Sequence, residues 1–159
     1  EQQLDPDEVF WIGMGSGGQA MVELLLQGNP PPQGMIFDSY PADLQPYIDG
    51  GDLYAYQKEA FTRIFGAEGP QDYTLSNVNS LPEKTAWIWS NGDPQHPQSS
   101  LEAGAQLISA RDNAWVEDQN ENAHVFINKD ITLATRVASF LLTGDPSLPE
   151  TASEDTASE

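Results

Sequence analysis

The chain has 159 residues with 25 acidic and 6 basic side chains, and its formal charge is −19. A surface this acidic repels phosphate backbones and anionic lipid head groups, so nucleic-acid and membrane-surface partners are not expected. With no cysteine and only 2 histidines, the chain offers no disulfide framework, no thiolate or poly-histidine metal centre and no cysteine nucleophile. No apolar run approaches the roughly 20 residues that cross a bilayer. We therefore expect a soluble protein, with the cytoplasm and the periplasm both open as locations.

Charge and composition divide the chain into three parts. Residues 1–8 contain four acids and residues 145–159 contain five, with no lysine or arginine in either segment. The second segment carries the sequence TASE twice and has nothing to bury, so it is predicted to be a disordered acidic tail. Residues 1–8 are a polar lead-in, and residues 9–144 have the length and apolar content of one α/β domain.

The first half of this domain alternates strand and helix patterns. A short apolar run rich in β-formers, residues 9–12, fits a strand buried on both faces and ends in the glycine-rich turn 13–18. Residues 19–27 are rich in helix formers, and Gly28 with the prolines that follow ends this helix. We then expect a strand at 34–38, a loop at 39–52, a helix at 54–65 and irregular chain at 66–83.

The second half continues the alternation. A strand is expected at 85–90, a helix from Ser99 or Ser100 as N-cap to about Ala110, and a short strand at 114–117. The last helix is predicted to run from Asp130 as N-cap to Gly144. Its expected apolar stripe comprises Ile131, Ala134, Val137, Ala138 and Leu141. Strands and helices that alternate in this way predict the α/β class, with a mainly parallel sheet and flanking helices.

The glycine-rich turn fits two different chemistries. Gly13, Gly15 and Gly18 match the dinucleotide fingerprint G-x-G-x-x-G, and Asp38 lies at the spacing of the acid that binds a ribose. The same turn fits the nucleophile elbow G-x-S-x-G, in which Gly13 and Gly17 flank a nucleophile position that falls on Gly15. A third interpretation is a tight turn between strand and helix that binds no ligand.

The second half of the domain favours the elbow. Residues 87–97, which contain the turn Asn91-Gly92-Asp93-Pro94, resemble the acid-bearing loop of α/β-hydrolases. Residues 122–126 resemble the loop that carries the catalytic histidine, and residues 136–141 resemble the last helix of that superfamily. The order of elbow, acid and histidine is the hydrolase order. The resemblance covers about residues 9–142 and corresponds to the C-terminal half of a complete hydrolase.

This resemblance implies that Asp93 and His124 are the acid and the base of a hydrolase site. Gly15 stands at the nucleophile position and has no hydroxyl, whereas Ser16, one position later, is expected to supply a backbone N–H to the oxyanion hole. The chain is therefore expected to be a non-catalytic or incomplete hydrolase scaffold, similar to uncharacterised bacterial hydrolase-like proteins with degenerate elbows. Ser16 as nucleophile and water activated by Asp93 and His124 are the catalytic alternatives, so enzyme activity stays open.

The resemblance also implies a missing half-domain. In a complete hydrolase the second oxyanion donor comes from a loop before the elbow strand, and this chain has no such segment. The strand at 9–12 is then expected to have an unpaired edge that invites association. We expect either a protein partner or an N-terminal half-domain from which this chain was excised, and neither a metal nor a cofactor. A pure interaction module is compatible with the same features.

The competing hypothesis is a Rossmann-like dinucleotide- or ATP-binding domain that uses the GMGSGG turn and Asp38. Residues 9–38 also resemble adenylating enzymes, which place basic side chains after that aspartate to hold phosphates. Here no positive charge follows Asp38 until Lys58, and this counts against phosphate chemistry. His96 near Asp93 suggests a pair of metal ligands, but two residues make no site.

Overall fold

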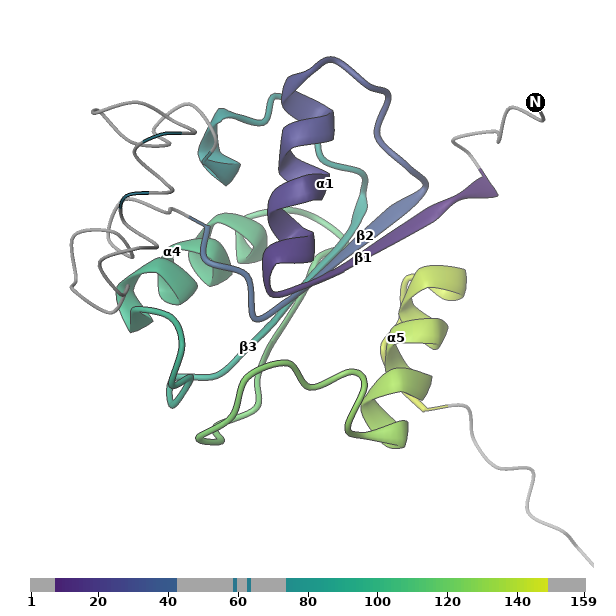
Figure 1. Cartoon of the computed structure of the whole chain (residues 1–159). Coiled ribbons are helices and arrows are strands. Elements are labelled where there is room, and N and C mark those ends of the chain that lie inside the picture. The colour runs from purple at the N-terminus through teal and green to yellow at the C-terminus, as the bar shows by residue number, and fades with distance from the viewer. Residues whose placement is uncertain (1–7, 43–58, 60–62, 64–73, 149–159) are drawn as a thin grey trace, which may run out of the picture.

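A computed structural model describes residues 8–42, 59, 63 and 74–148 (Figure 1). Its strands are β1 (Phe10–Met14), β2 (Gly34–Asp38), β3 (Lys84–Trp89) and β4 (Trp115–Asp118). Its helices are α1 (Ser16–Leu26), the short 3₁₀ helix η3 (Leu75–Asn77), α4 (Gln98–Ser109) and α5 (Ile131–Thr143). None of the described helices is long and apolar enough to cross a membrane.

The four strands form one parallel sheet in chain order, β1-β2-β3-β4. Phe10 pairs with Gly34 at the start of β1 and β2, and Met14 pairs with Asp38 at their end. Because all strands run the same way, the loops that follow β1, β2, β3 and β4 gather at one edge of the sheet. This architecture confirms the α/β class with a parallel sheet, and it brings the predicted site loops to the same edge.

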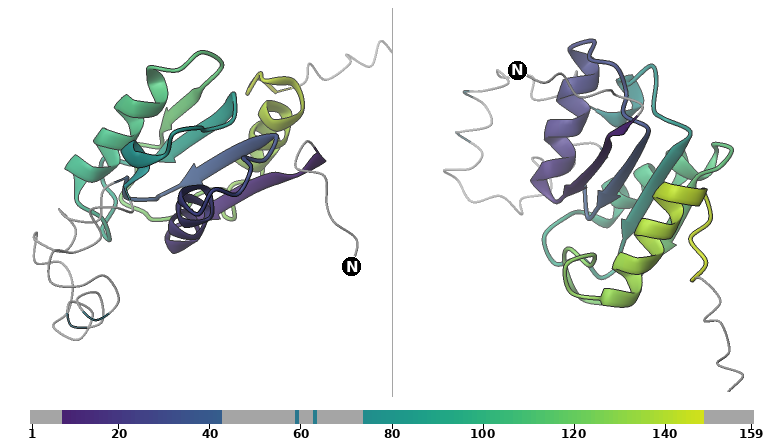
Figure 2. Two further views of the ribbon diagram at one scale, coloured as in Figure 1. Left: turned by 90° about the horizontal axis from the view of Figure 1, so that it is seen from above. Right: turned by 90° about the vertical axis from the view of Figure 1, so that its right-hand side faces the viewer.

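Helices cover both faces of the sheet (Figure 2). One core lies between the sheet and the helices α1 and α4, with Met21 and Val22 packed near Phe37 and Trp87. The second core lies under α5. Its buried members are Ile36, Ala86, Ile88, Trp115, Phe126, Leu133, Val137, Phe140 and Leu141. Residues of β2 alternate between the two cores, as they must in a strand that is buried on both faces. The prediction that the first strand is also buried on both faces is wrong, because β1 lies at the end of the sheet and leaves Ile12 and Met14 46% and 42% exposed.

The first strand and helix lie one to three residues away from the predicted bounds. β1 extends through Gly13 to Met14, and α1 begins at Ser16 rather than at residue 19. Glycines 17 and 18 therefore lie inside the first turn of the helix despite their low helix propensity. The packing of α1 against β1 outweighs this low propensity, because the helix must approach the end of the strand closely.

The predicted N-cap of the third helix is wrong. α4 begins at Gln98, and Ser100 lies buried in its first turn. The carbonyl of Pro97 accepts hydrogen bonds from the N–H groups of Ser100 and Leu101, at 3.0 and 3.4 Å. Proline fixes its own φ near the helical value, so it can start the helix without a side-chain cap.

The last helix confirms the predicted ends but not the whole predicted stripe. The Asp130 carboxylate accepts the N–H of Thr132 at 2.8 Å, and Gly144 ends the helix with φ +83°. Ile131 is 81% exposed and Ala138 is also exposed, whereas Leu133 and Phe140 are buried with Val137 and Leu141. The face toward the sheet is therefore rotated relative to the expected one.

Several predictions fall outside the described residues. These are the helix at 54–65, most of the loop 39–52, part of the segment 66–83, the lead-in and the tail. Within the described part of 66–83, the residues Leu75–Asn77 form the single 3₁₀ turn η3.

Candidate functional site

Gly15 forms the sharp turn between β1 and α1. Its backbone angles are φ +53° and ψ −122°, a combination that L side chains rarely adopt. Its N–H donates to the Asp38 carbonyl at 2.8 Å, and its carbonyl accepts the N–H of Gly18 at 3.0 Å. A Cβ on Gly13 would lie 2.7 Å from the Gly18 nitrogen, so the close approach of helix to strand requires glycine there as well. The turn is as tight as an elbow, and a residue with a side chain at position 15 would be strained there.

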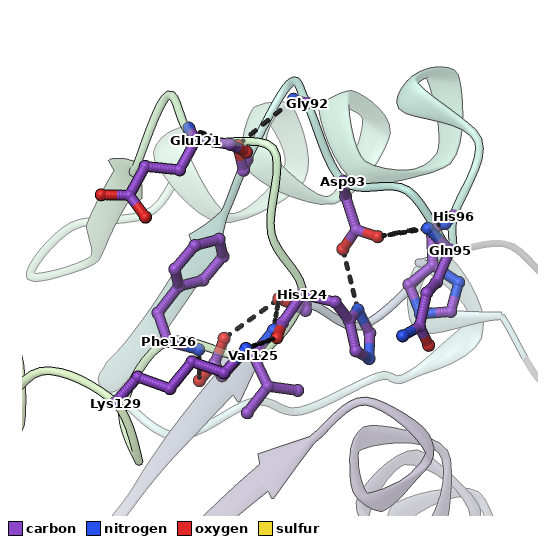
Figure 3. Close-up of polar contacts among 12 residues, drawn as sticks. Gly92, Asp93, Gln95, His96, Glu121, His124, Val125, Phe126 and Lys129 are labelled. Carbon is purple, nitrogen blue, oxygen red and sulfur yellow. Dashed lines mark hydrogen bonds and ion pairs between the residues drawn. The ribbon is translucent and has the colours of Figure 1, made fainter.

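Asp93 and His124 form a direct pair at the carboxyl edge of the sheet (Figure 3). The Nδ1 atom of His124 lies 2.9 Å from Oδ2 of Asp93. The Asp93 side chain is fully buried, and that of His124 is 15% exposed. Asp93 follows β3 and His124 follows β4, so two loops that are 31 residues apart meet here. Burial strengthens this interaction because little water competes for it.

The other Asp93 oxygen is held by its own loop. Oδ1 accepts the N–H groups of Gln95 and His96, at 2.7 and 3.2 Å. An aspartate that bonds to N–H groups two and three residues later stabilises a turn by itself. The same residue thus forms its turn and aims its second oxygen at His124.

The second ring nitrogen of His124 faces Gly15. A Cβ added to Gly15 would lie 3.1 Å from Nε2 of His124, with nothing nearer to it. The three sequence positions predicted as nucleophile, acid and base are therefore brought together. The position where the Cβ of a serine would lie is adjacent to the imidazole and carries only a hydrogen atom of glycine.

Ser16 occupies the first position of α1 and is exposed. No hydrogen bond joins its side chain to His124 in the part of the chain that the structure describes. Its place at the start of the helix suits a backbone N–H donor better than a nucleophile, because the first N–H groups of a helix have no intrahelical acceptor.

His96 packs edge-on against the His124 ring, with ring centroids 4.9 Å apart. Burial lowers the pKa of His96 to about 4, although the Asp93 charge opposes this shift. His96 is therefore neutral at pH 7 and adds no charge beside His124. Among the described residues, no three histidine, aspartate or glutamate side chains lie close enough together to hold a metal ion.

Asp38 is fully buried and holds the loop that follows His124. Its Oδ2 accepts the N–H groups of Phe126 and Ile127, both at 2.8 Å, and its Oδ1 accepts the Ser39 hydroxyl at 3.1 Å. Burial raises the pKa of Asp38, and the two backbone N–H donors oppose this shift. A ribose would have to displace these donors to reach the carboxylate, and this disfavours the nucleotide hypothesis.

Two serines complete the support of the site, and sequence reasoning missed both. The Ser39 Oγ accepts the N–H of Val125 at 2.9 Å and so fixes a β-branched residue at the unusual φ of +61°. The Ser90 hydroxyl donates to the Glu121 carbonyl and accepts the Glu121 N–H at 2.9 Å. These bonds span 86 and 31 residues, so no local sequence pattern signals them.

Comparison of the chain with protein families, with curated proteins and with solved structures found no match.

Proposed function

We propose that this chain is an α/β-hydrolase-like scaffold that keeps the acid and the histidine of a hydrolase site and does not perform acyl transfer. One observation carries this proposal: His124 bonds to Asp93 through Nδ1 and presents Nε2 to the Cβ position of Gly15. In a serine hydrolase the same three positions hold the orienting acid, the general base and the nucleophile. Here the nucleophile is missing.

The supporting geometry goes beyond the pair. The nucleophile position lies on a tight turn at the carboxyl end of a strand and at the start of a helix, with the positive φ that an elbow requires. The acid follows β3 and the histidine follows β4, in hydrolase order. An aspartate–histidine pair that only joined two loops would not need to face that turn.

Covalent catalysis needs a nucleophile within hydrogen-bond reach of the base. Glycine supplies none, and exposed Ser16 is not bonded to His124. The His96 ring packs on His124 and is neutral near pH 7, so it adds no positively charged proton donor to the site. The described part of the chain therefore retains the groups for proton transfer and lacks the nucleophile that would form the acyl intermediate.

The first experiment is hydrolysis of p-nitrophenyl acetate by the wild-type protein, with Ser16→Ala and His124→Ala as matched variants. We expect wild-type turnover equal to that of both variants and to background. Turnover lost in Ser16→Ala would make Ser16 the nucleophile. Turnover that survives Ser16→Ala and disappears in His124→Ala would show water activation by the pair. Either result would contradict the proposal.

A second experiment restores the hydroxyl. We expect Gly15→Ser to be labelled by a fluorophosphonate probe, and we expect Gly15→Ser combined with His124→Ala not to be labelled. The added Cβ would lie 3.1 Å from Nε2, so the His124 ring must move by a few tenths of an ångström. Equal labelling with and without His124 would contradict the assignment of position 15 as the nucleophile position.

The nucleotide-binding alternative has a separate test. Titration with NAD or ATP is expected to show no saturable binding below about 1 mM, a level that corresponds to roughly −4 kcal/mol. Saturable binding that is weakened by Asp38→Asn would favour that alternative.

A further inference from the structure

The outer edge of β1 is open in the part of the chain that the structure describes. β1 stands at the end of the strand order and pairs only with β2 (Figure 2). An edge strand presents a row of unpaired N–H and C=O groups, which is a template for another strand.

The hydrogen bonds at the two ends of β1 show which backbone groups face outward. The Val9 carbonyl accepts the N–H of Gln33, and the Gly15 N–H donates to Asp38, so odd-numbered residues bond toward β2. Backbone groups alternate in direction along a strand. The N–H and C=O groups of Phe10, Ile12 and Met14 therefore point to the open edge.

Within its own sequence, β1 carries none of the residues that usually protect an edge strand. Natural edge strands carry lysine, proline, inward-pointing charges or bulges that prevent pairing. β1 has the sequence FWIGM, and no charged residue occurs between Glu8 and Glu23. Ile12 and Met14 are 46% and 42% exposed, although they lie on an apolar strand. Phe10, Ile12 and Met14 therefore form a neutral, apolar strip on a chain of charge −19.

We infer that β1 pairs antiparallel with β1 of a second copy of this chain, across a twofold axis that passes through Ile12. The five residues of β1 are centred on Ile12, so the axis pairs Ile12 with itself and Phe10 with Met14. Each of these residues directs both backbone groups outward, which is the requirement for a hydrogen-bonded antiparallel pair. The strip is thus complementary to itself, as a twofold interface must be.

The same axis joins the exposed side chains. Ile12 and Met14 pair in register with Ile36 and Asp38, so they lie on the face that α5 covers. When the twofold axis is perpendicular to the sheet, the faces that α5 covers in the two copies lie on the same side of the joined sheet. Ile12 then lies beside its counterpart, and Met14 lies beside Phe10 of the other copy, as cross-strand apolar pairs. The inference does not depend on the proposed function.

The test is the mass in solution, measured by sedimentation over a range of protein concentrations. Ile12→Glu places two carboxylates opposite each other at the axis, and Ile12→Pro removes the N–H donors of the central pair. We expect each variant to weaken self-association roughly tenfold or more. Leu24→Glu is the matched control, because Leu24 is 41% exposed on α1. We expect it to associate like the wild type.

Salt gives an independent signature. Two copies of charge −19 repel each other, so we expect association to strengthen as NaCl is raised from about 0.02 to about 0.5 M. Circular dichroism checks that the variants fold. A mass of one chain at all concentrations and salt levels would overturn the inference.

Hydrogen exchange tests the register. We expect the amides of Phe10, Ile12 and Met14 to become protected as protein concentration rises. Protection that is independent of concentration would mean that another segment of the same chain covers the edge. A dimer that is unaffected by both Ile12 variants would mean that another surface joins the copies, such as α5 with its exposed Ile131 and Leu142. Either result would overturn the inference.

Discussion

Asp38→Ala should release the loop that carries His124. The substitution leaves the N–H groups of Phe126 and Ile127 without their buried acceptor, and the Ser39 hydroxyl loses its partner. An unsatisfied buried donor costs about 1–3 kcal/mol, so the two amides together cost roughly 2–6 kcal/mol. Removing a buried charge whose pKa is raised offsets part of this loss, and we expect a net destabilisation of about 2–4 kcal/mol.

The assay is urea unfolding, combined with hydrogen exchange of the Phe126 and Ile127 amides. Asp38→Asn is the matched control, because its carbonyl oxygen can accept both amides and its NH₂ group can donate to Ser39. We expect Asp38→Asn to keep the two amides protected and Asp38→Ala to expose them. An Asp38→Ala variant that loses less than about 1 kcal/mol with both amides still protected would refute the role of Asp38.

Three further predictions concern the same scaffold. Burial raises the folded-state pKa of Asp38 above its ordinary value of 3.8, so the folded protein binds this proton more tightly than the unfolded chain. The unfolding free energy of the wild type relative to Asp38→Asn should therefore fall as pH rises from about 4 through the raised pKa; a pH-independent difference would contradict this. Gly104→Ala should destabilise the fold by about 3 kcal/mol, because its Cβ would lie 2.0 Å from the buried Trp87 ring. A hydrogen bond to Leu101 holds this ring against α4. A thermal unfolding midpoint equal to that of the wild type would contradict this prediction. Asp130→Ala should lower the unfolding free energy by about 1 kcal/mol and Asp130→Asn by almost nothing, since the Asp130 side chain caps α5. Equal losses of unfolding free energy in the two variants, measured by denaturant titration, would argue against capping.

The order of elements could be read from the sequence because local signals coincide there. Apolar runs predicted the positions of β1 and β2, although only β2 is buried on both faces, and Asp130 and Gly144 predicted the ends of α5. The proximity of Gly15, Asp93 and His124 could be predicted because each lies in a short motif and the three occur in the order of a hydrolase site. Parallel strand order then brings their loops to one edge.

The supporting contacts were not predictable, for a physical reason. Ser39 and Ser90 act on loops that are far away in sequence, through side-chain bonds to backbone groups. Serine is common in such loops and carries no periodic signal. The spacing of Asp38 suits a ribose ligand, but in the structure its carboxylate accepts two backbone amides. Only the packing of β2 against the loop after His124 distinguishes these uses.

The central claim is that His124 is a hydrolase-type base, oriented by Asp93, that faces an empty nucleophile position. The most direct measurement is a ¹⁵N–¹H NMR spectrum of the His124 ring in the wild type and in Asp93→Asn. We predict that the neutral wild-type ring carries its proton on Nδ1, that Nε2 is unprotonated, and that Asp93→Asn disturbs this tautomer. A wild-type ring protonated on Nε2, or a tautomer unchanged in Asp93→Asn, would contradict the account.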